Sequence, residues 1–401
     1  MTIWLISKYA SPQKYYFGTR HFYLAEEWVK LGHDVSIFTS NSSHLSNQLP
    51  KFKSKVFFEI INGIKTYWLN TVRSKSSSGM SRIFGWLHFE WQLATLSTND
   101  ISKPDVVIVS SLSLLSVLNG YRYAKKYGSK FVFEVRDIWP LSAIELGNFS
   151  PANPLIYLLS LIEKFGYKNA DVIVGTIPNL KEHVENVIGK TDKCFCIPQG
   201  INLDFYSEQE KLNDEYIKTN IPSNKFIVIY AGTINANNPL QVMLEAAKIL
   251  KESPVHFMIV GEGNQKMSLM ERAKDISNVS FPPSVNKNQV NHLLSFASVC
   301  FDCFSSSLAR YGLSRNKWID YMYAGKPIIC SYSGFQSMIN ECDAGSFVSY
   351  NDEKALASEI LRYLNFSKDE LEDMGKRAKN FVIENRTFPF LAKKYLHLFA
   401  Q

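Results

Sequence analysis

Short apolar runs alternate along the chain with stretches in which apolar residues recur at helical spacing. Strands joined by helical crossovers of this length form parallel sheets that are covered on both faces. The segment 60–66 is expected instead as a strand in a local antiparallel excursion. The other strands expected in the N-terminal half are 3–6, 34–39, 105–109, 131–135, 171–174 and 194–197.

A second series begins after the polar, charged stretch 207–224. The predicted fold class is therefore α/β, with two doubly wound, Rossmann-like domains over 1–205 and 206–385. The aromatic, amphipathic segment 386–401 is expected to be a helix that crosses back to the first domain. The strands expected in this second series are 226–230, 256–260, 279–281, 299–304 and 327–330.

The composition narrows the function classes only mildly. A chain of 401 residues with 46% hydrophobic and 20% charged residues is globular over most of its length. Its net charge of +7 suits an anionic small substrate or a membrane surface and falls short of a nucleic-acid-binding stripe. Six cysteines make no disulfide framework, and Cys300 and Cys303 are expected to be buried thiols. With no signal peptide and no apolar run of about 18 residues, a cytoplasmic protein is expected.

The segment 314–327 carries the first candidate site. Ser314 is the expected N-cap of a helix, which places Arg315 and Lys317 in the first turn without an acidic neighbour there. The helix dipole disfavours cations at that end, and a bound phosphate would reverse the penalty. Asp320 lies one turn deeper, where its carboxylate could accept hydrogen bonds from ribose hydroxyls. Alternatively, the two cations are solvated side chains at a frayed helix start.

The turn after the first strand is a second candidate. Gly18 permits close approach of the backbone, and Arg20 is again a cation in a first helical turn. An ordinary strand-to-helix turn explains these residues equally well.

Two loops of the C-terminal domain are rich in small residues. Gly232 and Thr233 lead into a free helix N-terminus, and Gly261 and Gly263 form the equivalent loop with Lys266. Both loops suit the binding of a diphosphate. Alternatively, they only turn the chain, as many loops of this kind do.

The end of the strand at 131–135 carries a fourth candidate. Arg136 and Asp137 stand just before Trp139-Pro140, which is unusual for a buried strand. A catalytic or acceptor-binding role competes with structural ion pairing.

These motifs resemble the family 4 glycosyltransferases of the GT-B fold, in which two domains face each other across a cleft. The resemblance extends in order over nearly the whole chain and is to the branch that builds bacterial lipopolysaccharide O-antigen and capsule, whose best-described members are N-acetylfucosaminyltransferases. The matching segments are 18–21 (GTRH), 133–140 (FEVRDIWP), 197–201 (IPQGI), 230–232 (YAG), 260–263 (VGEG) and 316–327 (NKWIDYMYAGKP).

The resemblance implies a retaining transferase that uses a nucleotide-diphosphate sugar, usually UDP-linked, without a metal or other cofactor. The donor would bind the second domain, with Asp320 on the ribose and basic residues such as Lys317 on the leaving diphosphate. The acceptor, an undecaprenyl-diphosphate-linked saccharide, would bind the first domain. From its position at the end of a first-domain strand, Asp137 is expected to orient the acceptor hydroxyl or to hydrogen-bond the donor sugar, with Arg136 balancing its charge.

The sequence departs from the family pattern in several places. The first glutamate of the family's E-x7-E motif falls at Gly312, and Asp320 replaces the second. Arg136 stands where many relatives have a histidine. Because 233–239 contains no cation, the diphosphate is expected to be neutralised by Lys317, Arg315, Lys266 or Arg20. A nucleotide-sugar 2-epimerase of the same fold and a non-catalytic glycosyltransferase-like subunit therefore stay open as alternatives. A nicotinamide dehydrogenase is disfavoured because the first turn lacks the G-x-G-x-x-G motif.

A basic and aromatic segment favours a peripheral position on the inner face of the cytoplasmic membrane. Arg73, Lys75 and Arg82 precede the segment 83–91, which contains two tryptophans. Interfacial helices combine cations for anionic headgroups with aromatic rings at the boundary. A buried helix of the first domain explains the segment equally well.

Overall fold

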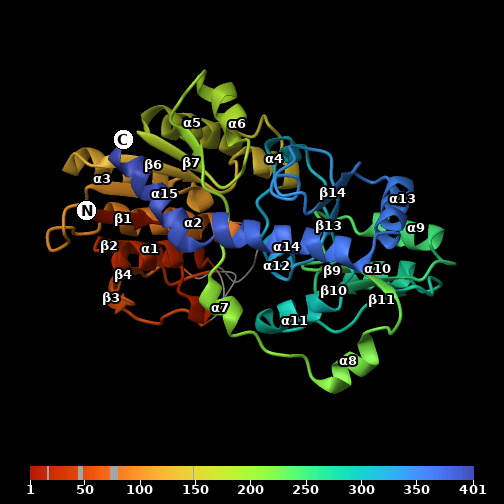
Figure 1. Ribbon diagram of the computed structural model, residues 1–401. Helices are drawn as coiled ribbons and strands as arrows, with labels where there is room; N and C mark the ends of the chain where they lie inside the picture. Colours follow the sequence, from red (N-terminus) through yellow and green to blue (C-terminus); the bar gives the residue numbers. More distant parts are fainter. Residues whose placement is uncertain (16–17, 44–47, 73–79, 148) are drawn as a thin grey trace. The chain divides into compact units, whose positions relative to one another are not determined.

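The computed structural model describes residues 1–401 except 16–17, 44–47, 73–79 and 148. The chain forms two compact units (Figure 1). Unit 1 comprises Met1–Pro198 with Phe388–Gln401, and unit 2 comprises Gln199–Thr387. The division thus falls at residue 198 rather than at 205, and the C-terminal segment returns to unit 1.

Unit 1 is built on an eight-stranded sheet in the order β3-β4-β2-β1-β5-β6-β7-β8. Neighbouring strands are parallel except β3 and β4, which form an antiparallel hairpin. The antiparallel excursion expected near 60–66 is therefore confirmed, but the single strand is wrong: Asn62 and Gly63, both at positive φ, turn the chain in the middle of it. The strands are β1 (Thr2–Ile6), β2 (Asp34–Ser40), β3 (Val56–Ile61), β4 (Ile64–Leu69), β5 (Val106–Ser110), β6 (Lys130–Val135), β7 (Val172–Gly175) and β8 (Cys194–Cys196).

Helices cover both faces of the central part of this sheet, which explains why β1, β5 and β7 are apolar without alternation. Ile3 and Leu5 of β1 pack in one cluster with Trp28 of α1 (Arg20–Lys30), whereas Trp4 packs against Tyr123 of α3 (Ser116–Tyr127). The other helices of unit 1 are α2 (Met80–Ala94), α4 (Leu141–Gly147), α5 (Pro154–Asn169), α6 (Leu180–Ile188) and α15 (Phe388–Ala400), with 3-10 turns η1 (Gln13–Tyr15) and η2 (Ser111–Ser113).

The C-terminal helix α15 lies beside α1 (Figure 1). The indole Nε1 of Trp28 donates a hydrogen bond to the carbonyl of Ala392, and Leu391 is fully buried in the same cluster. This packing explains the aromatic amphipathic pattern at the end of the chain, because one face of α15 completes the core of unit 1.

Unit 2 contains a six-stranded, wholly parallel sheet in the order β11-β10-β9-β12-β13-β14. This is the doubly wound arrangement, and its order reverses between β9 and β12. The predicted α/β fold class of two Rossmann-like domains is confirmed. The strands are β9 (Phe226–Ala231), β10 (Val255–Val260), β11 (Val279–Ser280), β12 (Val299–Cys303), β13 (Ile328–Ser331) and β14 (Gly345–Val348).

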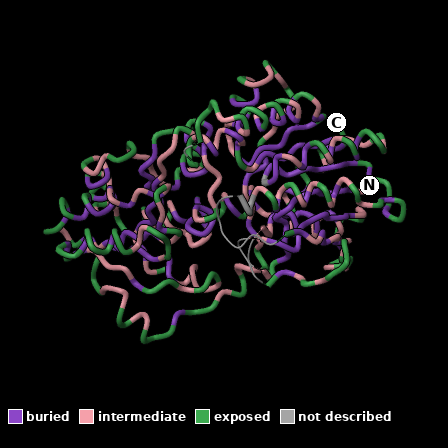
Figure 2. The backbone as a smooth tube through the Cα atoms, turned by 180° about the vertical axis from the view of Figure 1, so that it is seen from behind, coloured by how far each residue is buried: buried purple, intermediate pink, exposed green. Residues whose placement is uncertain are grey.

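Two hydrophobic cores sandwich the sheet of unit 2. Val228 and Tyr230 of β9 belong to one core, and Ile227 and Ile229 to the other. The buried strands and half-buried helices can be followed along the backbone in Figure 2. The helices of unit 2 are α7 (Leu203–Ser207), α8 (Asp214–Asn220), α9 (Gln241–Ile249), α10 (Lys266–Arg272), α11 (Val290–Ser295), α12 (Asn316–Tyr323), α13 (Glu353–Leu364) and α14 (Lys368–Asn385), with 3-10 turns η3 (Lys287–Gln289) and η4 (Ser307–Tyr311).

Candidate functional site

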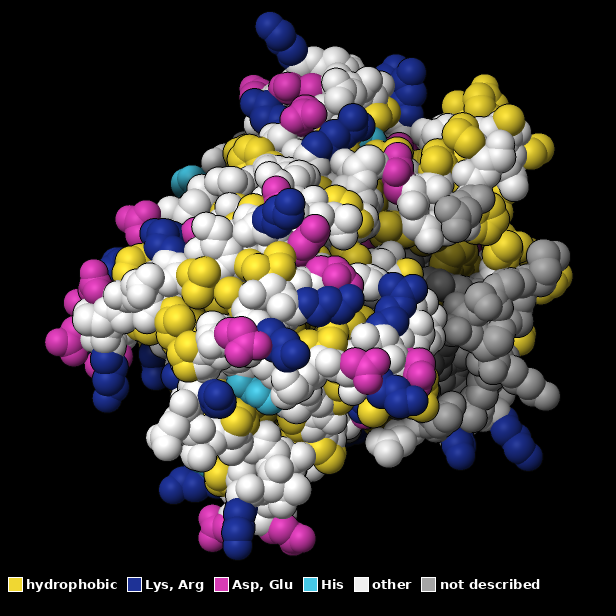
Figure 3. All heavy atoms as spheres, turned by 90° about the vertical axis from the view of Figure 1, so that its right-hand side faces the viewer, with side chains coloured by type: hydrophobic (Ala, Val, Ile, Leu, Met, Phe, Trp, Pro, Cys, Tyr) yellow, Lys and Arg dark blue, Asp and Glu magenta, His cyan; other side chains and the backbone are white. Residues whose placement is uncertain are grey.

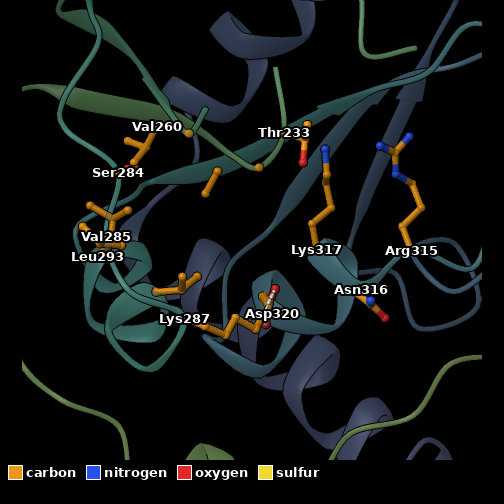
Figure 4. A pocket seen from close by; sticks show the side chains of 14 residues that line it. Thr233, Val260, Ser284, Val285, Lys287, Leu293, Arg315, Asn316, Lys317 and Asp320 are labelled. Carbon is orange, nitrogen blue, oxygen red and sulfur yellow. Dashed lines mark hydrogen bonds and ion pairs between the residues drawn. The ribbon is translucent and has the colours of Figure 1, made fainter. Parts of the chain in front are cut away.

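A cavity of about 480 Å³ opens at the carboxyl edge of the sheet of unit 2 (Figure 4). It lies beside the point where the strand order reverses, which is where open α/β sheets bind ligands. Its walls come from the loops after β9 and β10, from the segment around η3 and from the start of α12. The lining residues are Ala231, Gly232, Thr233, Val260, Gly261, Ser284, Val285, Lys287, Val290, Leu293, Arg315, Asn316, Lys317 and Asp320.

Two cations at the start of α12 extend side by side along one wall (Figure 4). Both pair with Asp302 of β12: the Nε of Arg315 lies 3.1 Å from its Oδ2, and the Nζ of Lys317 lies 3.0 Å from its Oδ1. The Lys317 ammonium also donates to the Tyr230 hydroxyl at 2.8 Å and lies 4.1 Å from the centre of that ring. Burial lowers the pKa of Lys317, and the Asp302 carboxylate acts against that shift.

The expected N-cap of α12 is wrong by one residue. Arg315 occupies the cap position, and the Ser314 hydroxyl instead accepts a hydrogen bond from the backbone N–H of Gln199. The first turn of α12 contains no acidic residue, as expected, but Asp302 of β12 pairs with both cations. Neither residue is a solvated side chain: 16% of the Arg315 side chain and 12% of that of Lys317 are exposed.

Asp320 lies on the next turn of α12, and its carboxylate is already engaged. The Tyr206 hydroxyl of α7 donates to Oδ1, and the Lys287 ammonium lies 2.5 Å from both carboxylate oxygens. The Asp320 side chain is 9% exposed and that of Lys287 is 47% exposed. A carboxylate has about four lone-pair positions, so this one can still accept hydrogen bonds from a ligand.

The packing of the loops also requires small residues around the cavity. A Cβ on Gly261 would lie 1.9 Å from the carbonyl oxygen of Gly232, and one on Gly232 would lie 3.0 Å from the side chain of Lys317. Thr233, Gly232 and Gly261 line the cavity. The other two predicted residues of these loops do not line it: Gly263 packs against the backbone of Ile234, and Lys266 pairs with Glu262 at 2.8 Å.

In unit 1, contacts within the protein account for Gly18 and Arg20, the two residues of the second candidate site. A Cβ on Gly18 would lie 1.9 Å from the carbonyl oxygen of Tyr9. The Arg20 side chain, 3% exposed, donates to Glu134 at 3.2 Å and to the carbonyls of Ile197 and Pro198. These contacts account for Arg20 structurally, and its contact with a donor phosphate stays a prediction.

Arg20 belongs to a buried polar network around Glu134. The Nε2 of His21 lies 2.5 Å from the Glu134 carboxylate, and the Tyr395 hydroxyl donates to it at 2.6 Å. Burial acts to raise the pKa of Glu134, but His21, Arg20 and Arg136 outweigh it and hold that pKa well below its usual range. The network fixes α1 and α15 to the end of β6.

Arg136 and Asp137 follow β6 directly. Their backbone N–H groups donate to the Ser111 hydroxyl, which in turn donates to the carbonyl of Asp137. The Asp137 side chain is exposed, whereas the Nε of Arg136 is buried with no hydrogen-bond partner among the described residues. Burial lowers the pKa of Arg136. The structure thus brings this pair together at the carboxyl edge of the sheet of unit 1, and their catalytic roles stay a prediction.

Two family models match the chain in succession. The model described as Glycosyltransferase Family 4 matches residues 18–205, and that described as Glycosyl transferases group 1 matches residues 225–365. The chain carries the domains of a GT-B glycosyltransferase. The first match lies largely in unit 1, and the second contains the cavity with Lys317 and Asp320.

Individual relatives of these glycosyltransferase domains are distant. The colanic acid biosynthesis glycosyl transferase WcaI of Escherichia coli is 23% identical over 268 residues, which span 64% of this chain and 65% of that protein. Sucrose-phosphate synthase of Thermosynechococcus elongatus has a similar structure, with a TM-score of 0.70 at 18% identity over 100% of this chain and 98% of that one. HepE of Anabaena, solved in complex with UDP and glucose, gives a TM-score of 0.66 at 11% identity over 100% and 99% of the two chains.

Three residues of the candidate site were missed by the sequence analysis. Asp302 could have been found, because it is a charged residue inside the apolar strand Val299–Cys303. Tyr206 and Lys287 carry no such signal, since each lies far in sequence from Asp320 and in a polar surrounding.

Proposed function

We propose that the protein is a retaining glycosyltransferase that moves a sugar from a UDP-linked donor to a lipid-linked saccharide. The transferred sugar is a hexose or an N-acetylated amino sugar. The acceptor is an undecaprenyl-diphosphate-linked saccharide of O-antigen or capsule synthesis. The observation that carries the proposal is the pair of nearly buried cations, Arg315 and Lys317, on the wall of a cavity that also contains the Asp320 carboxylate.

The charges of the cavity suit a nucleoside diphosphate. Arg315 and Lys317 carry two positive charges against the single negative charge of Asp302, and the N-terminus of α12 adds a positive dipole end. Asp320 would accept the ribose hydroxyls one turn away. UDP is chosen as the nucleotide because HepE, which shares the fold, was solved with UDP and glucose.

The same cations serve the reaction. When the bond between the sugar C1 and the diphosphate oxygen breaks, the electron pair goes to that oxygen, and the diphosphate gains charge. Lys317 and Arg315 stabilise this charge more strongly in the transition state than in the ground state. The acceptor oxygen forms its bond to C1 on the same face, and its proton passes to the departing phosphate oxygen.

We propose that no metal takes part. In the described ranges, no three His, Cys, Asp or Glu side chains gather as they would around a metal ion. Arg315, Lys317 and the helix dipole would neutralise the diphosphate instead. Removal of divalent ions tests this directly.

The acceptor side of the proposal rests on unit 1. Asp137 would orient the acceptor hydroxyl or the donor sugar, with Arg136 balancing its charge, at the carboxyl edge of the sheet. These roles are inferred from position and chemistry.

Helix α2 supports a place at the inner face of the cytoplasmic membrane. Its Phe89 and Leu93 are buried, whereas Phe84, Leu87 and Trp91 are exposed on the other side, Trp91 by 66%. The buried side of the helix belongs to the packing of unit 1, and we propose that the exposed side meets the membrane. Arg73 and Lys75, which supported the lipid contact, lie outside the described residues, as does the side chain of Arg82.

Other surface features bear on the partners. None of the helices in the described part of the chain is long and apolar enough to cross a membrane. On the face shown in Figure 3, Lys and Arg side chains are interspersed with Asp and Glu, so no basic stripe for nucleic acid is seen there.

A donor screen followed by a transfer assay tests the function. A ligand that binds only the native state raises the melting temperature, so UDP and one or more UDP-sugars should stabilise the protein. The stabilising donor should then label an undecaprenyl-diphosphate-linked saccharide with retention of the anomeric configuration. Epimerisation of the free donor would indicate the 2-epimerase, and absence of any nucleotide binding would indicate the non-catalytic subunit.

A further inference from the structure

A carboxylate is buried in the middle of the unit 2 sheet. Asp302 belongs to β12, whose other residues are Val299, Cys300, Phe301 and Cys303, and none of its surface is exposed. Burying an unpaired carboxylate is costly, so such residues persist where cations and hydrogen bonds satisfy them.

The partners of Asp302 all lie at the start of α12. Oδ2 pairs with the Nε of Arg315 at 3.1 Å and accepts a hydrogen bond from the indole Nε1 of Trp318 at 2.7 Å. Oδ1 pairs with the Lys317 ammonium at 3.0 Å. One carboxylate thus connects the central strand to three side chains at the start of the helix, those of Arg315, Lys317 and Trp318.

Both cations have a second contact that fixes their direction. Lys317 donates to the Tyr230 hydroxyl of β9, and Arg315 donates to the Asn238 side chain at 2.5 Å. With Asp302 between them, two like charges lie next to each other on the wall of the cavity although they repel.

The charges that act on Lys317 come from a few neighbouring groups. Arg315 repels it and Asp302 attracts it, while burial disfavours its charged form. Burial also raises the pKa values of Cys303 and Tyr230, so the thiol and the phenol are uncharged at neutral pH. Around Asp302 the same holds for Tyr321 and Cys330.

We infer that Asp302 is a positioning residue of the donor site: it keeps Lys317 charged and holds Lys317 and Arg315 together against the donor diphosphate. The inference rests on the proposed function, because it assigns the residue that prepares the same site. Asp302 itself lies behind the cations and is not among the residues that line the cavity.

The sign of the expected pH dependence follows from the charge on Lys317. A bound diphosphate favours the ammonium, so affinity is lost as pH rises through the pKa of Lys317 in the free protein. That pKa lies below 10.5, because burial disfavours the charge. Removing Asp302 takes away an opposite charge within about 4 Å, which is worth about 1–3 pH units. The alkaline loss of affinity must then move toward neutral pH.

The experiment measures UDP affinity by calorimetry between pH 6.5 and 10 in the wild type and in Asp302→Asn. We expect the alkaline fall in affinity, which we call the falling limb of the pH profile, to occur at least about one pH unit lower in Asp302→Asn. At pH 8 the affinity of the variant should be about tenfold weaker or more. UDP titrates identically in both measurements, so only the protein can move the limb. Tyr230→Phe is the matched control, since it removes a hydrogen bond from Lys317 without changing a charge.

Asp302→Asn leaves two buried cations without a carboxylate and could prevent folding. Asp302→Asn combined with Lys317→Gln removes one charge of each sign, and in the alkaline range its pH profile should show only the titration of UDP itself. If the wild type binds UDP and the limb stays in place in Asp302→Asn, or if affinity rises because an anion has left the site, the inference is overturned. If even the wild type binds no nucleoside diphosphate, the proposed function fails first.

Discussion

The ammonium of Lys287 lies 2.5 Å from both carboxylate oxygens of Asp320, the residue expected to hold the donor ribose. The lysine comes from η3 and is about half exposed, whereas the carboxylate is nearly buried. A ribose that hydrogen-bonds to Asp320 must therefore share the carboxylate with Lys287 and with the Tyr206 hydroxyl.

Lys287→Met should tighten UDP binding about two- to fivefold, because it frees lone pairs of Asp320 for the ribose. Stability should change by about 1 kcal/mol or less, because solvent screens the half-exposed ammonium and the Tyr206 hydroxyl still donates to the Asp320 carboxylate. Calorimetry with UDP measures the effect, and Lys266→Met, whose partner Glu262 lies outside the cavity lining, is the control. A tenfold weaker affinity would show instead that Lys287 contacts the nucleotide itself.

Lys317→Ala should lower kcat by about 10²–10³, the range for removing one group that stabilises developing negative charge. UDP affinity should fall as well. Asp302 keeps Arg315 and Trp318 as partners, so the variant should still fold. Steady-state kinetics and a melting curve on one preparation measure both, with Lys266→Ala as control. Wild-type kinetics in Lys317→Ala would remove this lysine from the site.

Transfer activity should survive EDTA. The diphosphate would be met by Arg315, Lys317 and the N-terminus of α12, so a chelator removes nothing that the reaction uses. The measurement is the transfer rate before and after dialysis against EDTA. Loss of activity that Mg²⁺ or Mn²⁺ restores would reveal a metal requirement.

Asp137→Asn should keep the fold and lose about 10²–10⁴-fold in transfer rate, as positioned acid–base or orienting groups do. The backbone of this residue is held by Ser111 whatever the side chain is, so the substitution leaves the turn intact. Melting temperature and kcat are measured together. A variant that melts earlier but transfers sugar normally would assign Asp137 to the scaffold.

Replacing Phe84 and Trp91 together by serine should release the protein from vesicles that contain anionic lipid, because both side chains are exposed on the apolar face of α2. Co-sedimentation with such vesicles measures binding. Leu118→Ser, an exposed leucine of α3, is the control. Unchanged sedimentation of the double variant would remove this face from membrane contact.

The sequence by itself determined the elements and the local spacing within them. Apolar runs and helical periodicity are local properties, and they sufficed to predict two parallel α/β domains and a C-terminal amphipathic helix. Arg315, Lys317 and Asp320 share one helix, so their grouping could be predicted from spacing alone. The antiparallel excursion near 60–66 was predicted but its hairpin was not, although Asn62-Gly63 is a typical hairpin turn that is visible in the sequence.

Only the tertiary structure decided which side chains meet. The strand order of unit 2 places β12 beside β9, and this brings Asp302 and Tyr230 to Lys317. Tyr206 reaches Asp320 across 114 residues of sequence. In unit 1, the fold surrounds Arg20 with Glu134 and backbone carbonyls, so a cation that looked ready for phosphate is bound inside the protein. Such partners depend on topology, which a local pattern of residues does not encode.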